Sequence, residues 1–444
     1  MPDIQERISQ KAYGERALVM NYTQAIEYIH SVNWVFCKPG LQRVTELCSA
    51  LGDPQDKLKF IHVAGTNGKG SFCAMTDSIL RQAGYKVGLF TSPYITQFNE
   101  RMRINGENIS DSELCELVEY IKPYADKMTD KPTEFELITA LAFLYFARHN
   151  CDVVVLECGL GGRLDATNVI KTPVLSVITG ISLDHTSILG DTVEKIAAEK
   201  AGIIKSGVPC LWCGENGEAE NIIRQQAQDV GAPFLMTDKN ALSVTEMTLD
   251  GTTLDVLNIK DAHLSLLGSY QPTNALNAVS AVKILENNGF CIDENAIRKG
   301  LANTRWQARF EVISRDPLVI ADGGHNPEGI DAATESVKRY FGQEKVAVVT
   351  GVMADKDYEY MAKRIAEISD RVFCLTPDNP RALGAEKYAR VFEQLGVSAT
   401  AHESVDDAVR SALEWAKSNN RAIVALGSLY MYGEVAQSVE KHTK

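Results

Sequence analysis

The sequence has no apolar run long enough to cross a membrane. No window approaches the roughly 20 consecutive apolar residues that a membrane-spanning helix needs. Residues 1–16 are charged and have no apolar core, so they do not resemble a secretory signal peptide. We therefore expect no membrane partner.

Cysteine is sparse, with 10 among 444 residues, which is well below the density of a disulfide scaffold. Cys210 and Cys213 are the one close pair, and without a second pair they are a weak zinc signal. The plainer interpretation makes them two residues of a buried strand. A reducing cytoplasm is the simplest compartment for such a chain.

An excess of positive charge is also absent. The chain has 45 Lys and Arg against 58 Asp and Glu, a net charge of −13. Because this field repels polyanions, we expect no nucleic-acid partner, and an anionic substrate needs a local cluster of cations or backbone N–H groups. A hydrophobic content of 45% excludes disorder of the whole chain. The length predicts two or three domains.

The chain does contain short apolar runs that alternate with helical stretches almost throughout. Continuous apolar runs suit strands that are buried on both faces, so this order predicts an α/β fold with doubly wound, mostly parallel sheets. The candidate strands are residues 59–65, 86–92, 152–159, 174–180, 208–213, 318–324, 346–352, 371–377 and 422–428.

Residues 240–259 have a different pattern, which alternates around Asp250-Gly251 and predicts a small antiparallel appendage. Residues 262–290 suggest a loop followed by a helix. The pattern of strands and helices restarts near residue 303. We therefore predict an N-terminal domain over 1–302 and a smaller, Rossmann-like α/β domain over 303–444, with a cleft between them.

The strongest single signal is the glycine-rich turn 65–71, which lies between a buried strand and a helix. Its glycines let backbone N–H groups approach phosphate oxygens, and the helix N-terminus adds partial positive charge. Lys69 supplies a mobile charge for the outer phosphates. The strict G-x-x-x-x-G-K-[ST] pattern fails, because Val63 replaces its first glycine and Gly70 follows the lysine. The expected nucleotide contacts are Thr66, Asn67, Gly68, Lys69, Gly70 and Ser71.

A second glycine-rich turn, residues 159–164, also follows a candidate strand. The dinucleotide-binding motif G-x-G-x-x-G would need glycine at its last position. Leu164 stands there instead, so the sequence gives little support to a dinucleotide-binding fold.

Together the motifs resemble those of folylpolyglutamate synthases, which belong to the Mur ligase superfamily. The likeness runs from about residue 39 to 433, and the order of the motifs along one chain makes it specific. The matching strings are HVAGTNGKGS, TSPY, NERMRING, VVLECGLGGRLDATN, DH, AAEKAGIIK, SLLGSYQPTNA, WQARFEVI, DGGHNP, GVMADKD and GSLY.

The resemblance implies ATP-dependent amide formation through an acyl phosphate, with ADP and phosphate as products. It assigns ATP binding to the domain 1–302 and glutamate ligation to 303–444. Members of the family extend the γ-linked glutamate tail of folates, add L-glutamate to dihydropteroate, or do both. We expect the bifunctional activity, with a monofunctional folylpolyglutamate synthase as the alternative.

The resemblance also implies two Mg²⁺ sites that use Ser92, Glu157 and His185, and it allows a monovalent cation. Glu157 ends a buried strand, where an ionised carboxylate needs a partner. Ser71 is the metal hydroxyl of ordinary phosphate loops, whereas the family pattern gives this role to Ser92. Mg²⁺ prefers oxygen to the imidazole of His185, which Asp184 would orient.

Lys200 has two interpretations. In the family the corresponding lysine is carbamylated, which makes it an anion that supports the metal and phosphate. From the residues alone it is a solvated lysine in a helix that Asp191 and Glu194 start as a capping box and Gly202 ends.

The remaining site residues also follow from the resemblance. Arg309 can bind phosphate with its guanidinium, or else form an interdomain salt bridge. Since the expected ATP contacts come from both predicted domains, we expect ATP in the cleft. The assignments are Asn274 (ATP base or phosphate), Arg309 (phosphate), Asp322 (ribose), His325 (catalytic, with Lys69 and Lys200), Ser428 (glutamate), and Phe135 and Asp165 (pterin). TEFE at 133–136 and Tyr94 depart from the family pattern and leave the first acceptor open.

Two other functions compete with this one. A cell-wall amino-acid ligase with another carboxylate acceptor usually carries an additional N-terminal domain, and only about 60 residues precede the phosphate loop here. A nucleotide-dependent switch would need no second substrate site, which the motifs DGGHNP and GSLY oppose. We expect small-molecule substrates and a monomer.

Overall fold

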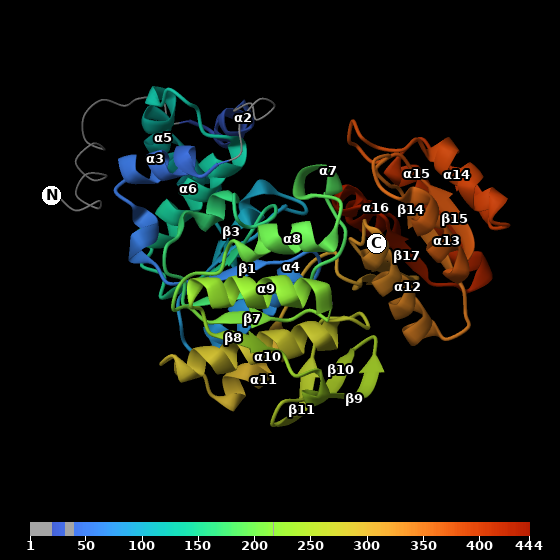
Figure 1. Ribbon diagram of the computed structural model, residues 1–444. Helices are drawn as coiled ribbons and strands as arrows, with labels where there is room; N and C mark the ends of the chain where they lie inside the picture. The colour runs from blue at the N-terminus through green and yellow to red at the C-terminus, as the bar shows by residue number, and fades with distance from the viewer. Residues whose placement is uncertain (1–19, 32–39, 216) are drawn as a thin grey trace. The chain divides into compact units, whose positions relative to one another are not determined.

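The computed structural model describes residues 20–31, 40–215 and 217–444 (Figure 1). The chain divides into two compact units. The first holds the described residues up to Asp238 together with Asn277–Gly300, and the second holds Lys239–Leu276 and Leu301–Lys444. The predicted domain limits, 1–302 and 303–444, stay a prediction. No helix in the described ranges is long and apolar enough to span a bilayer.

The first unit is built on an eight-stranded sheet in the order β4-β3-β2-β5-β1-β6-β7-β8. Six strands are parallel, and β3 and β4 form an antiparallel edge. The four most central strands are buried on both faces, which explains their continuous apolar sequences. The strands are β1 (Phe60–Ala64), β2 (Val87–Phe90), β3 (Met102–Ile104), β4 (Glu107–Asn108), β5 (Val153–Glu157), β6 (Leu175–Ile178), β7 (Cys210–Trp212) and β8 (Phe234–Met236).

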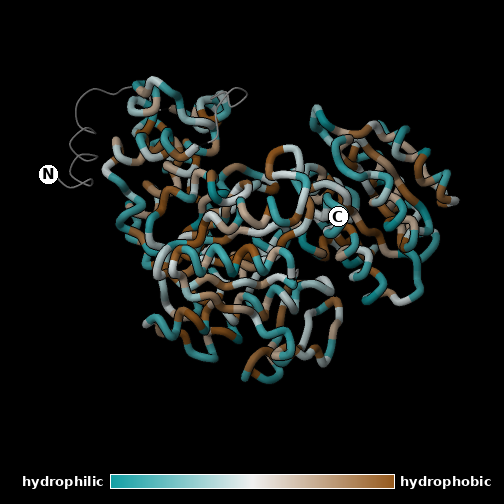
Figure 2. Tube along the Cα trace, in the orientation of Figure 1, coloured by the Kyte–Doolittle hydropathy of each residue, from teal (hydrophilic) through white to brown (hydrophobic). Residues whose placement is uncertain are grey.

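α-Helices follow directly after β1, β4, β6 and β7, and Figure 2 shows the mixture of hydrophilic and apolar residues along the chain. In α6, Thr133 and Glu136 form a capping box ahead of an almost wholly buried run. The helices are α2 (Tyr22–Ser31), α3 (Gln42–Ala50), α4 (Lys69–Gln82), α5 (Asp111–Lys127), α6 (Glu134–Arg148), α7 (Thr186–Leu189), α8 (Val193–Ala201) and α9 (Gly217–Val230).

The predicted start of α8 is wrong by one residue. Thr192 caps the helix by accepting a hydrogen bond from the Lys195 amide at 3.3 Å. The Asp191 carboxylate instead accepts one from the Lys195 ammonium, at 2.7 Å. Gly202 ends the helix, as predicted.

The second unit contains two sheets. The first has three antiparallel strands in the order β11-β10-β9, and Asp250-Gly251 joins two of them, so the predicted antiparallel appendage is confirmed. The other has six strands in the order β12-β13-β17-β14-β15-β16, and only the edge strand β12 is antiparallel to its neighbour. The strands are β9 (Leu242–Thr248), β10 (Gly251–Val256), β11 (Ile259–Leu264), β12 (Glu311–Arg315), β13 (Leu318–Ala321), β14 (Val346–Thr350), β15 (Ser369–Cys374), β16 (Ser398–Ala401) and β17 (Ile423–Leu426).

Five helices accompany the six-stranded sheet, with a buried core that includes Ile320, Val348 and Phe392. This arrangement confirms the predicted C-terminal α/β fold and the predicted mixed α/β class. The helices are α12 (Pro327–Phe341), α13 (Tyr358–Ile368), α14 (Ala385–Gln394), α15 (Val405–Asn419) and α16 (Tyr432–Thr443). Two further helices, α10 (Gln271–Asn287) and α11 (Glu294–Asn303), contribute residues to both units.

A buried ion pair joins α3 to α6 in the first unit, and it provides a test of the fold. The guanidinium of Arg43 meets the carboxylate of Glu136 with two hydrogen bonds, of 2.9 and 3.0 Å. Arg43→Met leaves this carboxylate buried without its main counter-charge, so we expect a loss of about 3–5 kcal/mol in unfolding free energy by urea titration. Lys171→Met, at the exposed pair with Asp56, should leave the urea midpoint unchanged. An Arg43→Met protein as stable as the wild type would contradict this account.

Candidate active site

The glycine-rich turn lies where β1 ends and α4 begins, at the centre of the eight-stranded sheet. Gly65 has a φ of +151°, and a Cβ atom there would lie 2.0 Å from the Oγ1 atom of Thr179. That hydroxyl donates a 2.7 Å hydrogen bond to the carbonyl of Asn67. The Thr66 amide donates to the Gly180 carbonyl at 2.8 Å. The turn is therefore fixed against the segment after β6, and it leads directly into the N-terminus of α4, a position that suits an anion.

Two lysine side chains converge on this turn. The Lys69 ammonium donates hydrogen bonds to the carbonyls of Gly65 and Thr66, both at 3.1 Å. The Lys200 ammonium, from α8, donates to the same Gly65 carbonyl at 2.7 Å. Because two cations so close together repel, an anion bound at the turn would relieve the repulsion.

Lys200 is buried, so its interpretation as a solvated lysine is wrong. Burial is the main cause that lowers the pKa of Lys200 to about 7, and the charge of Lys69 lowers it further. Asp184 and Asp165 act in the opposite direction. A large share of the Lys200 amines is therefore neutral near physiological pH.

Two of the three predicted metal ligands lie together. Glu157 ends β5 and is 5% exposed, and Ser92 follows the neighbouring strand β2. The Ser92 amide donates a 3.3 Å hydrogen bond to the Glu157 carboxylate. The Ser92 hydroxyl accepts a 2.9 Å bond from the guanidinium of Arg101. Sequence reasoning missed Arg101, although it lies inside the NERMRING motif.

His185 has a different setting. It precedes α7 with a φ of +49°, its side chain is 49% exposed, and its Nε2 atom is 3.9 Å from an oxygen of Asp184. Among the residues that the structure describes, no three or more His, Cys, Asp or Glu are grouped to hold a metal. Hydroxyl, carboxylate and phosphate oxygens suit Mg²⁺, so Ser92 and Glu157 fit this ion better than His185 does.

The two predicted pterin contacts meet the same turn, residues 159–165. The Asp165 carboxylate is buried and accepts hydrogen bonds from the amides of Leu160 at 2.8 Å and Thr167 at 3.0 Å. Burial raises the pKa of this carboxyl although these bonds oppose the rise. The ring of Phe135 packs on Gly159, where a Cβ atom would lie 2.5 Å from the ring. Asp165 thus shapes the turn against which Phe135 rests.

In the second unit, Asp322 is a buried hydrogen-bond acceptor at the end of β13. Its carboxylate accepts hydrogen bonds from the Tyr270 hydroxyl at 2.7 Å and from the amides of Phe310 at 2.9 Å and Gly324 at 2.7 Å. Burial, followed by the charge of Asp322, raises the pKa of Tyr270 well above its usual range. Sequence reasoning missed Tyr270, which lies within the motif SLLGSYQPTNA.

Arg309 sits in a strained segment. Its neighbours Ala308 and Phe310 have φ values of +54° and +48°, a conformation that non-glycine residues rarely adopt. The Arg309 guanidinium donates to the Ala308 carbonyl at 2.9 Å. Asn274, in the first turn of α10, donates from its side chain to Gln271 at 3.0 Å. Strain of this kind is common at ligand sites.

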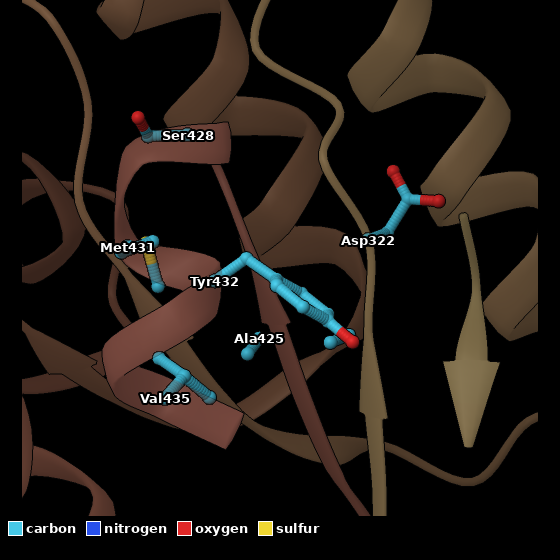
Figure 3. Close-up of a pocket in the computed structure, with 7 residues that line it drawn as sticks. Asp322, Ala425, Ser428, Met431, Tyr432 and Val435 are labelled. Carbon is cyan, nitrogen blue, oxygen red and sulfur yellow. The ribbon is translucent and has the colours of Figure 1, made fainter. Parts of the chain in front are cut away.

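His325 and Ser428 lie on two turns at the carboxyl edge of the six-stranded sheet, where ligands gather in α/β folds. The Gly427 amide donates to the Gly324 carbonyl at 3.0 Å and so joins these turns. The Nδ1 atom of His325 is 2.8 Å from the Gly323 carbonyl. Beside them is the small cavity of Figure 3, which is lined by Ala321, Asp322, Ala425, Ser428, Met431, Tyr432 and Val435.

Comparison with known families gives the class of this protein. The model of the Mur ligase middle domain matches residues 63–282, and that of the Mur ligase glutamate ligase domain matches 308–429. These matches cover the glycine-rich turn 65–71 in the first unit and the turns of His325 and Ser428 in the second. The chain therefore contains the middle domain and the glutamate ligase domain of the Mur ligases.

Similar proteins of known name show which family of Mur ligases this chain resembles. The dihydrofolate synthase/folylpolyglutamate synthase of Bacillus subtilis is 38% identical over 432 residues, which cover 94% of this chain and 99% of the relative. The folylpolyglutamate synthase structure of Thermotoga maritima has a TM-score of 0.82 at 35% identity, covering 95% and 97% of the two chains. The Mycobacterium tuberculosis folylpolyglutamate synthase, complexed with ADP and AMPPCP, has a TM-score of 0.85 at 29% identity, covering 95% and 98%.

The chain belongs to the folylpolyglutamate synthase/dihydrofolate synthase family. It is an ATP-dependent ligase that forms an amide bond with glutamate. The resemblance noted in the sequence motifs is thus confirmed, and a nucleotide-dependent switch without ligation is excluded.

The buried amine of Lys200 predicts how stability depends on pH. Below about pH 7 the Lys200 amine is protonated in the folded and the unfolded chain, and burial of the ammonium lowers the free energy of unfolding. Above about pH 7 the folded chain has lost this proton while the unfolded chain retains it, so the free energy of unfolding rises with pH. The wild type should therefore gain stability relative to Lys200→Met as pH rises from 7 towards 10. Urea titrations in CO₂-free buffer, with Lys195→Met on the exposed side of α8 as control, measure this. A pH-independent difference between Lys200→Met and wild type would contradict the assignment.

Proposed function

We propose that this ligase adds L-glutamate both to the γ-glutamyl tail of reduced folates and to dihydropteroate. The observation that carries the proposal is the pair of lysines on the Gly65 carbonyl after β1, in the same sheet whose strands β2 and β5 end near Ser92 and Glu157. Two cations and a helix N-terminus suit the phosphates of ATP, and adjacent oxygen ligands suit Mg²⁺. The bifunctional relatives of Bacillus subtilis and Escherichia coli support the choice of both acceptors.

The reaction has two steps. An oxygen of the acceptor carboxylate attacks the γ-phosphorus of ATP, the bond from that phosphorus to the β–γ bridging oxygen breaks, and ADP leaves. The neutral amine of glutamate then attacks the carbonyl carbon of the acyl phosphate, phosphate leaves, and the amine loses a proton. Phosphoryl transfer of this kind depends mainly on positioning and on neutralising charge.

Residues of the first unit supply that neutralisation. In the proposal, the amides of the turn 66–71 and the Lys69 ammonium bind the β- and γ-phosphates, and Ser71 contacts the nucleotide. Ser92, Glu157 and His185 would hold Mg²⁺ at two sites. When bound, Mg²⁺ supplies positive charge that draws electron density from the γ-phosphate oxygens. Phe135 and Asp165 would receive the pterin ring by stacking and by accepting its N–H donors.

Lys200 is proposed as a carbamylated lysine. Its neutral amine attacks the carbon of CO₂, an N–C bond forms, one proton leaves, and a carbamate anion results. The lowered pKa of Lys200, to about 7, supplies the neutral amine that this reaction needs. The product exchanges a buried cation beside Lys69 for an anion, which removes the repulsion between the two lysines.

Residues of the second unit complete the proposal. Asn274, Arg309 and Asp322 are assigned to the base or phosphate, the phosphates and the ribose of ATP, and His325 and Ser428 to the incoming glutamate. The domains 1–302 and 303–444 would then serve ATP binding and glutamate ligation. We further propose a monomer, a cytoplasmic location and an optional monovalent cation. No disulfide joins two cysteines of the described ranges, which supports a reducing compartment.

Release of ADP tests the function. Purified protein with ATP, Mg²⁺ and L-glutamate should release ADP with dihydropteroate and with tetrahydrofolate as separate acceptors, and each rate should need glutamate. Turnover with tetrahydrofolate alone would select the monofunctional alternative. Lys69→Ala should lose most of both rates, whereas Lys171→Ala, at an exposed lysine that pairs with Asp56 and lies outside the motifs, should retain them. Glutamate-dependent turnover with neither acceptor would refute the proposed substrates.

A further inference from the structure

The loop that carries Ser92 is organised by one buried carboxylate. Glu100 is 4% exposed, and its two oxygens accept hydrogen bonds from three consecutive backbone amides of this loop. Those bonds come from Ile95 at 2.8 Å, Thr96 at 3.1 Å and Gln97 at 3.0 Å. The Thr96 hydroxyl donates to the same carboxylate. A charged acceptor forms stronger hydrogen bonds than a neutral one, so Glu100 fixes the backbone of this loop firmly.

The next residue, Arg101, holds the other end of the loop. Its guanidinium donates the 2.9 Å hydrogen bond to the Ser92 hydroxyl. It also lies 5.0 Å from the ring centre of Tyr94 and 5.7 Å from that of Phe98, within the range of cation–π attraction. The Arg101 carbonyl accepts a 3.1 Å hydrogen bond from the Thr91 amide, which closes the loop at its base.

The preceding residue, Asn99, joins this loop to other elements of the first unit. Its side-chain amide donates to the Ile109 carbonyl at 2.7 Å and to the Asp111 carboxylate at 2.9 Å. Its oxygen accepts from the Tyr22 hydroxyl at 2.8 Å. These bonds of Asn99 fix the backbone next to Glu100 and Arg101, so both residues contact the loop from a fixed position.

We infer that Glu100 and Arg101 are positioning residues, which fix the loop 91–97 and thereby set where the Ser92 hydroxyl stands relative to the Glu157 carboxylate. Neither residue needs to touch a reacting atom for this role. The inference rests on the proposed function, in which Ser92 and Glu157 hold Mg²⁺. An outer residue that orients a metal ligand typically changes metal affinity or activity by about 10- to 100-fold.

Glu100→Gln tests the inference, because an amide has nearly the same shape but replaces one acceptor oxygen by a donor group that faces backbone donors. We expect the Mg²⁺ concentration for half-maximal ADP release to rise about tenfold. The affinity for ADP in EDTA, measured by calorimetry, should stay unchanged, since the turn 65–71 is not altered. Hydrogen exchange of the amides 95–97 should become faster. Arg101→Gln should raise the Mg²⁺ requirement in the same direction.

Three further variants serve as controls for the effect of Glu100→Gln on the Mg²⁺ requirement. Glu107→Gln, an exposed carboxylate in the same segment, should behave as wild type in every assay. Thr96→Val removes only one donor to Glu100 and should give a smaller shift of the same sign, which also covers the case that Glu100→Gln fails to fold. Ser92→Ala should raise the Mg²⁺ requirement at least as far as Glu100→Gln does.

The outcomes distinguish a failure of the proposed Mg²⁺ ligands from a failure of the positioning role. If Ser92→Ala leaves the Mg²⁺ requirement unchanged, the ligand assignment in the proposed function fails. The positioning role is overturned if Ser92→Ala raises the Mg²⁺ requirement, while Glu100→Gln or Thr96→Val speeds hydrogen exchange in the loop and leaves the Mg²⁺ requirement unchanged. Weakened ADP binding in EDTA by Glu100→Gln would also overturn it, because the damage would then extend beyond the loop.

Discussion

The ammonium groups of Lys69 and Lys200 donate to one carbonyl oxygen, that of Gly65. Two cations that share one acceptor, one of them the buried Lys200, are unfavourable unless an anion compensates them. The turn at Gly65 can accept this arrangement because it lacks a Cβ atom and passes close to Thr179. The two cations suit the proposed phosphate binding. The lowered pKa of Lys200, which comes first from burial and then from the charge of Lys69, suits its proposed carbamylation.

Sheet topology explains why residues far apart in sequence meet at this point. The strands β2, β5, β1 and β6 are adjacent and parallel, so their carboxyl ends lie in one row. Ser92 follows β2, Glu157 ends β5, Gly65 follows β1 and Thr179 follows β6. Open α/β sheets bind ligands at this edge because the turns there are free to carry varied residues.

Much of the fold could be predicted from the sequence. Continuous apolar runs identified the central strands, since strands such as β1 and β5 are buried on both faces. Asp250-Gly251 identified the antiparallel sheet through its turn chemistry. Short edge strands such as β4 and β8 were missed because two or three residues carry no periodicity. The cap of α8 was misplaced because Asp191 and Thr192 are both good caps.

The site was predictable in its residue types but not in its contacts. A glycine-rich turn with a lysine indicates phosphate binding locally, whereas the burial of Lys200 depends on how α8 packs on the turn. Glu100 is the N3 residue of a capping box whose N-cap is Gln97, but glutamine is not a preferred N-cap residue, so neither Glu100 nor Arg101 gave a separate signal. Asp322 was expected to bind ribose, and only the structure revealed its bonds to Tyr270 and Phe310.

In the proposed reaction, the acceptor carboxylate is activated as an acyl phosphate before glutamate attacks it. Transfer of ¹⁸O measures this most directly, with an acceptor whose reacting carboxylate is labelled at both oxygens. One labelled oxygen should appear in each molecule of phosphate released, because the C–O bond of the acyl phosphate breaks when the amide forms. Unlabelled phosphate from a glutamate-dependent turnover would contradict the account.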